Sequence, residues 1–195
     1  MTLLNKDYWD QRYKEDKTGW DIGEVSPPLQ QYFDQLDKKD IKILIPGAGN
    51  AYEASYLYRN GFKNIHVLDI APTALSNFIN ANPGFPESHC HQGDFFIHNL
   101  QYDLIIEQTF FCALNPLLRK NYVKKVSELL YPQGHLIGLL FKINFDLQSP
   151  PFGGSLSEYK LLFEALFEIE ILEECYNSIQ PRKGTELFIK MKKKP

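Results

Sequence analysis

The chain has 195 residues, of which 44% are hydrophobic and 23% charged; this fits one folded domain, 1–195, and argues against intrinsic disorder. Its formal net charge of −3 argues against a strongly basic nucleic-acid-binding protein. Four of the last six residues are lysine, and we expect this tail to be a solvated, frayed end.

The first 40 residues differ in composition from the rest of the chain. They contain both tryptophans and then the pair Pro27-Pro28, which is followed by the apolar-periodic stretch LQQYFDQL. Proline in the first turn favours the start of a short helix there. About 40 residues rarely build a core alone. We therefore expect residues 1–40 to form an N-terminal helical cap over a core made by residues 41–195.

From Ile41 onward, apolar runs typical of buried strands alternate with amphipathic stretches typical of helices. The apolar runs predict seven strands, at residues 41–45, 64–70, 88–94 (a short strand with its turn), 102–108, 135–141, 167–174 and 185–192. The stretches between them predict helices at residues 51–60, 72–82, 116–130 and 157–166. We expect Gly134 to separate the third of these helices from the fifth strand.

Strands that alternate with helices imply a parallel sheet with helices on both faces. The last two strands depart from this pattern, because only ten residues without a helical pattern, 175–184, join them. A connection that short suits an antiparallel pair. The sequence therefore predicts an α/β fold with a mostly parallel seven-stranded sheet and one antiparallel strand near its end.

A Pro-Gly-Ala-Gly loop between the first strand and its helix is the first candidate ligand site. Gly47 and Gly49 allow a ligand to approach the backbone closely, and the following helix N-terminus offers free N–H groups. The dinucleotide fingerprint requires a third glycine where this chain has Tyr52, and no P-loop pattern is present. Asp69 ends the second strand, 20 residues after Gly49, where an acidic residue accepts from ribose hydroxyls. Each feature alone fits a tight turn or a helix cap, but together they indicate an adenosine-type ligand.

Two further strand ends carry polar residues followed by aromatic ones. Asp94 and Phe95 follow the third strand, where the carboxylate can accept from an adenine amino group while the ring lies against the base. Glu107 and Gln108 end the fourth strand and precede the phenylalanines at 110–111, a pattern that suits the floor and wall of a small-molecule pocket. The alternative is a turn aspartate with phenylalanines that belong to the core.

The histidines do not predict a metal site. His89 and His91 lie two residues apart in the third predicted strand, so both imidazoles share one face and Cys90 lies on the other. Zinc needs three or four converging ligands, and the spacing of the other histidines supplies none, so we expect no bound metal. The basic turn PRKG at 181–184 is either a solvated hairpin or a cation that faces an anionic ligand.

Several segments occur in an order and spacing that is specific as a set, although each is weak alone. They are residues 20–23 (WDIG), 27–28 (PP), 44–49 (LIPGAG), 68–70 (LDI), 93–96 (GDFF), 110–116 (FFCALNP) with Arg119, and 181–184 (PRKG). In these segments, and over essentially the whole chain, the sequence resembles the thiopurine methyltransferase family of class I S-adenosylmethionine-dependent methyltransferases. It is more similar to the plant halide/thiol methyltransferases, which carry similar FFCA-x-x-P and P-x-RKG segments.

The resemblance implies a Rossmann-like class I methyltransferase fold and S-adenosylmethionine as the cofactor. Two residues depart from the plant members: Tyr13 stands where they have a second tryptophan, and Gln108 stands where they have tyrosine. We expect the cofactor to bind despite both changes, with Tyr13 beside it, and the acceptor preference to differ. The family pattern assigns to the cofactor Trp9 and Trp20 as a cover, Gly47 beneath the methionine part, Asp69 at the ribose, Asp94 and Phe95 at the adenine, and Gln108 near the methionine end.

The methyl group of the cofactor is already activated, so the protein chiefly aligns and desolvates the nucleophile. A thiolate or halide needs no general base, which agrees with the absence of a catalytic histidine from the motifs. We therefore predict methyl transfer to a small soft nucleophile: a thiol, hydrosulfide or halide. Arg119 and Arg182 are the candidates for holding an anionic acceptor, and Glu107 for taking a proton from a neutral one. The residues predicted to form the apolar wall of the acceptor pocket are Phe110, Phe111, Leu114 and Phe152.

Other functions remain compatible with the sequence. Within the same family, the acceptor can be a thiopurine, another aromatic thiol, or an oxidised selenium or tellurium anion. An NAD-dependent oxidoreductase is a different class, against which Tyr52 and the short final hairpin count. A non-catalytic protein that binds an adenosyl ligand is another.

The expected location is the cytoplasm. The three cysteines form no CxxC pair, which favours a reducing compartment, and the N-terminus lacks the apolar segment of a secretory signal. No apolar run is long enough to span a membrane. We expect a monomer whose partner is a small-molecule methyl acceptor rather than a membrane or a nucleic acid.

Overall fold

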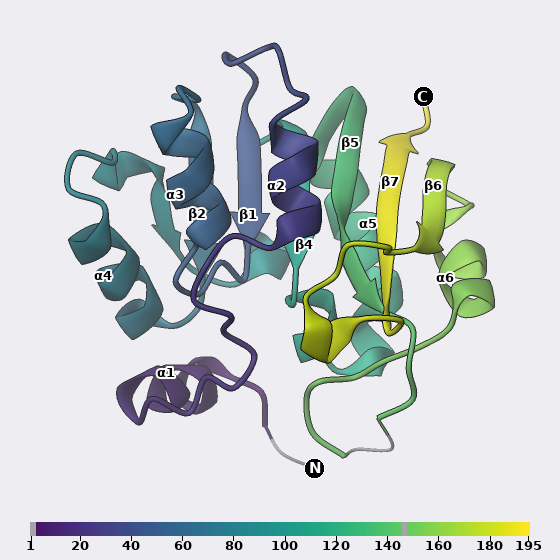
Figure 1. Ribbon diagram of the computed structural model, residues 1–195, viewed down its shortest axis with the longest axis horizontal. Helices are drawn as coiled ribbons and strands as arrows, with labels where there is room; N and C mark the ends of the chain where they lie inside the picture. The colour runs from purple at the N-terminus through teal and green to yellow at the C-terminus, as the bar shows by residue number, and fades with distance from the viewer. Residues whose placement is uncertain (1–2, 146–147) are drawn as a thin grey trace.

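The computed structural model describes residues 3–145 and 148–195, and seven strands form one sheet in the order β3-β2-β1-β4-β5-β7-β6 (Figure 1). The strands are β1 Ile43–Pro46, β2 Ile65–Asp69, β3 Cys90–Gln92, β4 Tyr102–Gln108, β5 Leu130–Phe141, β6 Phe167–Glu174 and β7 Glu186–Lys193. The helices are α1 Lys6–Lys14, α2 Pro27–Phe33, α3 Tyr52–Arg59, α4 Pro72–Ala81, α5 Arg119–Leu129 and α6 Leu156–Phe163.

The strand directions confirm the predicted mixed sheet. Neighbouring strands from β3 through β2, β1 and β4 to β5 pair in parallel. β7 runs antiparallel to both β5 and β6, between which it is inserted. The chain can enter β7 directly from β6 because an antiparallel partner needs only a short loop, whereas a parallel strand needs a crossover.

Helices cover both faces of the sheet, with α2 and α3 in front and α5 behind in Figure 1. The buried side chains of α2, α3 and α4 meet Ile43, Ile45 and Val67 in one apolar cluster. Those of α5 and α6 pack on the opposite face with Leu44 and Leu68. Because successive residues of β1 and β2 are buried on opposite faces, β1 is a continuous apolar run and β2 is apolar except for His66 and the final Asp69, the pattern from which they were predicted.

Three local predictions were wrong. The predicted helix 116–130 begins with a 3₁₀ turn, Pro116–Leu118, and α5 follows it. β5 starts at Leu130, so Gly134 lies within the strand, where the register with β4 shifts and the preceding Gln133 has a φ of +68°. The lysine-rich end is not frayed, because β7 continues to Lys193 and alternates its side chains across the sheet.

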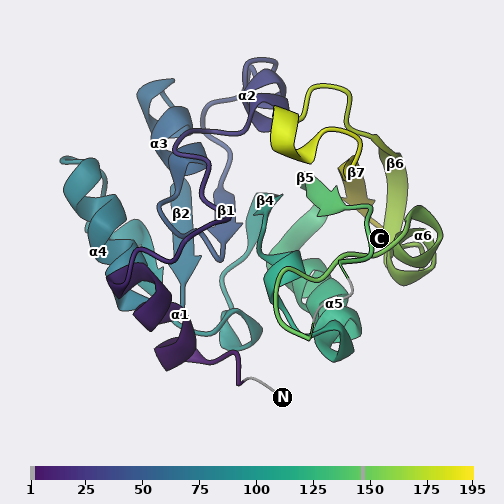
Figure 2. The ribbon, with the colours of Figure 1, turned by 60° about the horizontal axis from the view of Figure 1, so that its bottom comes forward.

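The N-terminal segment lies across the carboxyl ends of the parallel strands (Figures 1 and 2). The side chain of Asn5 caps α1 by accepting from the amide of Tyr8, at 3.0 Å. On the next turn, Asp10 accepts from the amide of Thr73 at the start of α4, at 2.9 Å. This contact ties α1 to the core. None of the helices in the described residues is long and apolar enough to cross a membrane.

Candidate active site

A cavity of about 480 Å³ lies between α1 and the carboxyl ends of the strands. Its walls come from α1, from the loops that follow β1, β2, β3 and β4, and from Pro150 and Pro151 in the long loop after β5. In an open α/β sheet, ligands bind at the carboxyl ends of the strands. The cavity is within the usual size range of small-molecule sites.

The structure brings most of the predicted cofactor residues together around this cavity. Gly49 and Gln108 are not among the residues that line it. Those that do are Trp9, Tyr13, Trp20, Gly47, Asp69, Asp94 and Phe95.

The glycine loop after β1 is built for close packing. Gly47 and Gly49 have φ values of +57° and +55°, a left-handed conformation that side chains disfavour. A Cβ atom at Gly47 would overlap the ring of Phe110, and one at Gly49 would lie 2.6 Å from the hydroxyl of Tyr13. Both glycines are therefore needed for the contacts that the loop makes with α1 and with the loop after β4.

Asp69 joins two of the loops that form the cavity. Its Oδ2 accepts from the amide of Gly49 and its Oδ1 from the amide of Ala71, both at 2.8 Å. The carboxyl is only 6% exposed, and this burial raises its pKa above the ordinary value for aspartate. Each oxygen keeps a second lone pair, so a ligand hydroxyl in the cavity can still donate to it.

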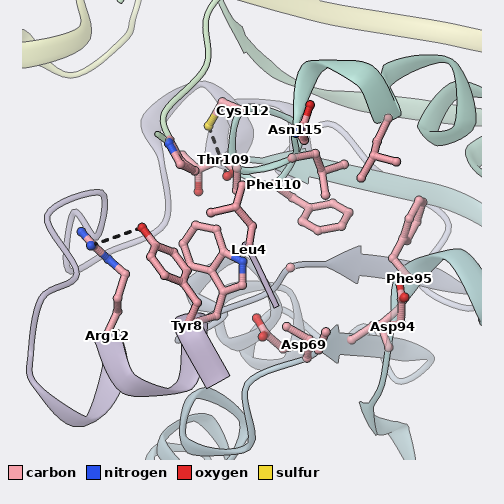
Figure 3. A pocket seen from close by; sticks show the side chains of 18 of the residues that line it. Leu4, Tyr8, Arg12, Asp69, Asp94, Phe95, Thr109, Phe110, Cys112 and Asn115 are labelled. Atoms are coloured by element: carbon pink, nitrogen blue, oxygen red, sulfur yellow. Dashed lines mark hydrogen bonds between the residues drawn. The ribbon is translucent and has the colours of Figure 1, made fainter. Parts of the chain in front are cut away.

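Asp94 and Phe95 form another part of the wall, on the far side of the cavity from α1 in Figure 3. Asp94 is exposed, and its Oδ1 caps the following 3₁₀ turn by accepting from the amide of Phe96, at 2.9 Å. Phe95 is buried and stacks on Tyr122 of α5, with a centroid distance of 5.5 Å.

The cover of the cavity is aromatic. Trp20 meets Trp9 and Tyr13 edge to face, with centroid distances of 5.6 and 5.9 Å. These rings pack on Ala71 and Ala74 of α4 and the turn before it. Burial raises the pKa of Tyr13 far above the ordinary value, so its hydroxyl stays protonated.

The two arginines predicted at the acceptor do not line the cavity. Arg119 is 6% exposed and donates to Glu158 of α6 and to the carbonyl of Gly153, at 2.7 Å. Arg182 pairs with Glu186 at 3.4 Å and donates to the carbonyl of Trp20 at 2.6 Å. Their positive charges are thus directed at internal partners.

Glu107, the predicted proton acceptor, is fully buried and does not line the cavity. Its Oε1 accepts from the amides of Phe110 and Phe111, both at 2.8 Å, and its Oε2 contacts the hydroxyl of Tyr122 at 2.5 Å. Burial raises the pKa of Glu107 to about 7. The adjacent Gln108 has a buried Oε1 without a hydrogen-bond partner among the described residues.

Of the three phenylalanines predicted for the acceptor pocket, only Phe110 lines the cavity. Phe111 is 1% exposed and packs in the core against Tyr122 and Tyr159. Phe152 lies in the loop after β5, where its amide donates to the carbonyl of Cys112, at 2.7 Å. This bond holds the neighbouring proline segment at the cavity wall.

The comparisons with known proteins identify the family. The thiopurine S-methyltransferase family matches residues 4–194, nearly the whole chain. The chain belongs to the thiopurine S-methyltransferase family. It is accordingly a methyltransferase that uses S-adenosylmethionine, as the resemblance implied.

Curated relatives carry related names. A probable thiol methyltransferase 2 of Arabidopsis thaliana is 29% identical over 191 residues, covering 95% of this chain and 84% of that protein. A thiopurine S-methyltransferase of Acinetobacter baylyi is 26% identical, covering 93% and 94%. A Burkholderia thailandensis 1,6-didemethyltoxoflavin-N1-methyltransferase structure with bound S-adenosylhomocysteine superposes with a TM-score of 0.77 at 14% identity, covering 97% and 87%, and thus shares the fold.

Sequence reasoning missed several cavity residues. Tyr8 and Arg12 both line the cavity and lie one helical turn apart on α1. Residues at i and i+4 share one face of a helix, so predicting a helix at residues 6–14 would have placed both side chains on the face of Trp9 and Tyr13 or next to it. Thr109, directly after β4, has a φ of +58°, which is a strained conformation for a β-branched residue. Its carbonyl accepts from the thiol of Cys112, which also lines the cavity. Cys112 belongs to the FFCALNP segment, but that motif did not assign it to the site.

The structure also gathers histidines that are far apart in the sequence. His66 stacks on His89 and on His91, with centroid distances of 4.2 and 5.1 Å, and His91 lies 5.2 Å from His98. His89 belongs to a 3₁₀ turn rather than to β3. Within residues 3–145 and 148–195, no group of three or more histidine, cysteine or acidic side chains is arranged to hold a metal ion.

Proposed function

We propose that this methyltransferase acts on a small, soft nucleophile that is anionic or readily ionised, such as a thiolate, hydrosulfide or halide. The cavity carries the proposal: its volume of about 480 Å³ has to accommodate both the cofactor and the acceptor, so the share left to the acceptor is small. Its predominantly apolar, aromatic wall suits a polarizable, weakly hydrated nucleophile better than a hard oxygen.

The residues around the cavity fit the cofactor. Asp69 would accept from the ribose hydroxyls, and Asp94 with Phe95 would hold the adenine. Gln108 does not line the cavity but directly precedes Thr109, which does; its buried Oε1, which has no hydrogen-bond partner among the described residues, would accept from the ammonium group of the methionine part once its side chain turns toward the cavity. Gly47 gives the backbone of the loop a close approach. When bound, S-adenosylmethionine supplies an activated methyl group, so an ionised acceptor needs no protein base.

The remaining predicted residues are better explained as positioning residues. Arg182 holds the carbonyl of Trp20 and thereby the aromatic cover. Arg119 holds the loop at Gly153. Glu107 holds the amides of the loop after β4, which presents Phe110 to the cavity. Their contribution is to align the site and exclude water, which is the main demand of an in-line displacement.

The test is a panel of acceptors, with S-adenosylhomocysteine production as the readout. Hydrosulfide, thiocyanate and iodide represent the proposed class, and a catechol and a primary amine represent oxygen and nitrogen acceptors. A separate calorimetric measurement of NADH binding tests the oxidoreductase alternative. We expect turnover with the soft anions and no binding of NADH. Preference for the catechol or the amine would contradict the proposal.

A second candidate acceptor is an aromatic thiol or thiopurine, favoured by relatives such as the Acinetobacter baylyi thiopurine S-methyltransferase. Thiophenol, a thiopurine and oxidised selenium or tellurium anions therefore belong in the same panel. Higher kcat/KM for the bulky thiols than for hydrosulfide would favour this candidate.

We further propose that the protein acts as a cytoplasmic monomer on small molecules and not on nucleic acids.

A further inference from the structure

We propose that Arg12 binds the anionic methyl acceptor. This inference rests on the proposed function and assigns a residue to it. Arg12 is the sole cationic side chain among the described residues that line the cavity. The positive charge that the acceptor needs is therefore supplied by the N-terminal helix and not by either arginine predicted from the sequence.

The guanidinium of Arg12 is held in place without an ion pair among the described residues; Glu15, whose carboxylate pairs with Lys17, attracts it only through space. Its Nε donates to the carbonyl of Lys17 at 3.2 Å and its Nη1 donates to the hydroxyl of Tyr8 at 3.4 Å. The group also lies over the ring of Trp20, 5.3 Å from the centroid. Within residues 3–145 and 148–195, Arg12 forms no ion pair and its Nη2 has no hydrogen-bond partner.

The other two arginines differ in this respect. Arg119 forms an ion pair with Glu158, and Arg182 forms one with Glu186. Moving either guanidinium to the cavity would leave a carboxylate without its partner. Arg12 can receive an anion without breaking an ion pair, so its charge is available at lower cost.

The position of Arg12 suits an acceptor. Figure 3 shows Arg12 and Tyr8 at one end of the cavity, Asp94 and Phe95 at the other, and Asp69 between them. The two carboxylates lie on the side proposed for the adenosine and repel an anion there. The end near Arg12 offers the opposite charge, together with the hydroxyl of Tyr8.

The chemistry predicts which kinetic constant changes. The lone pair of the acceptor forms the new bond to the methyl carbon, while the bond from that carbon to the sulfonium sulfur breaks and its electron pair stays on the sulfur. One negative and one positive charge disappear together. Arg12 therefore interacts more strongly with the free anion than with the transition state, so its loss should raise KM and leave kcat unchanged or higher.

The experiment compares Arg12→Gln and Arg12→Lys with the wild type, and uses Lys6→Gln as the matched control. Lys6 is an exposed cation on the same helix that does not line the cavity. Calorimetry measures thiocyanate binding to each protein saturated with S-adenosylhomocysteine, and thiocyanate carries its charge at every pH used. The affinities for S-adenosylhomocysteine and for 5′-deoxy-5′-methylthioadenosine, which lacks the amino-acid part, are measured alongside.

We expect Arg12→Gln to weaken thiocyanate binding about tenfold, the effect of one charge-assisted hydrogen bond at a half-buried site. Arg12→Lys should recover part of the loss, and Lys6→Gln should bind like the wild type. A wild-type protein that does not bind S-adenosylhomocysteine would refute the proposed function itself.

Three results would overturn the role of Arg12 alone. The first is unchanged thiocyanate affinity in Arg12→Gln, or no thiocyanate binding to a wild type that binds S-adenosylhomocysteine. The second is weaker binding of S-adenosylhomocysteine with unchanged binding of methylthioadenosine, which would place Arg12 at the cofactor carboxylate. The third is weaker binding of both nucleosides, which would make Arg12 a structural part of the cover.

Discussion

Replacing Glu107 by glutamine tests whether this buried carboxyl is structural. Glu107 is completely buried, and its pKa rises from the ordinary 4.5 to about 7. Between these two pH values the unfolded chain releases the proton while the folded protein keeps it, so stability falls as pH rises and levels off above about pH 7. The total loss is about 3 kcal/mol. Glutamine resembles the protonated form, because it can accept from the amides of Phe110 and Phe111 and donate to Tyr122.

We therefore expect Glu107→Gln to match the wild type in urea unfolding at pH 5 and to exceed it by about 3 kcal/mol at pH 8.5. The exposed Glu168→Gln is the control and should show no such pH-dependent difference. The variant should also retain methyl transfer to thiocyanate, since Glu107 lies outside the cavity. A variant that is less stable than the wild type at pH 8.5, or that loses turnover while folded, would refute the reasoning.

Three other predictions follow from the site and the sheet. Asp69→Ala should weaken S-adenosylhomocysteine binding about tenfold to a hundredfold in calorimetry. It should also lower the free energy of unfolding by about 2 kcal/mol, since the substitution leaves two buried amides unpaired. Unchanged affinity in a folded variant would contradict the assignment of Asp69 to the ribose. Residues 3–24 have few aliphatic side chains, and their hydrogen exchange should slow when S-adenosylhomocysteine binds; equal protection with and without the ligand would exclude a closing cover. Burial and its histidine neighbours lower the pKa of His66 to about 3, so the wild type should lose stability relative to His66→Gln as pH falls below 6.5; parallel pH profiles of the two proteins would contradict this.

The sheet could be predicted well because its signals are local. β4 was predicted with its observed limits, since its apolar centre, residues 104–106, is followed directly by the polar pair Glu107-Gln108. The loops after β1 and β2 were predicted because the two glycines and the strand-final aspartate, each ambiguous alone, occur together at the spacing of an adenosine site. The start of β5 was predicted less well. Leu130 pairs with Tyr102 of β4 and His135 pairs with Leu104, so the register shifts between these two pairs. Such a shift is not visible in the hydropathy of the sequence.

The charges of the site were harder to predict, because pairing across the fold decides them. Arg119 finds Glu158 39 residues later in the chain, and the carbonyl that Arg182 binds, that of Trp20, is 162 residues away. Sequence spacing shows neither contact, so both arginines looked available for an anionic acceptor. Arg12, whose charge remains available for an anionic acceptor, lies in α1. The polar composition of this helix gives only weak hydrophobic periodicity, so the sequence did not predict it.

A crystal structure of the protein with S-adenosylhomocysteine bound tests the proposed cofactor site most directly. We expect the nucleoside in the cavity beneath α1, with the ribose hydroxyls donating to Asp69 and the adenine beside Asp94 and Phe95. Density for the cofactor outside this cavity, or a ribose directed away from Asp69, would contradict this expectation.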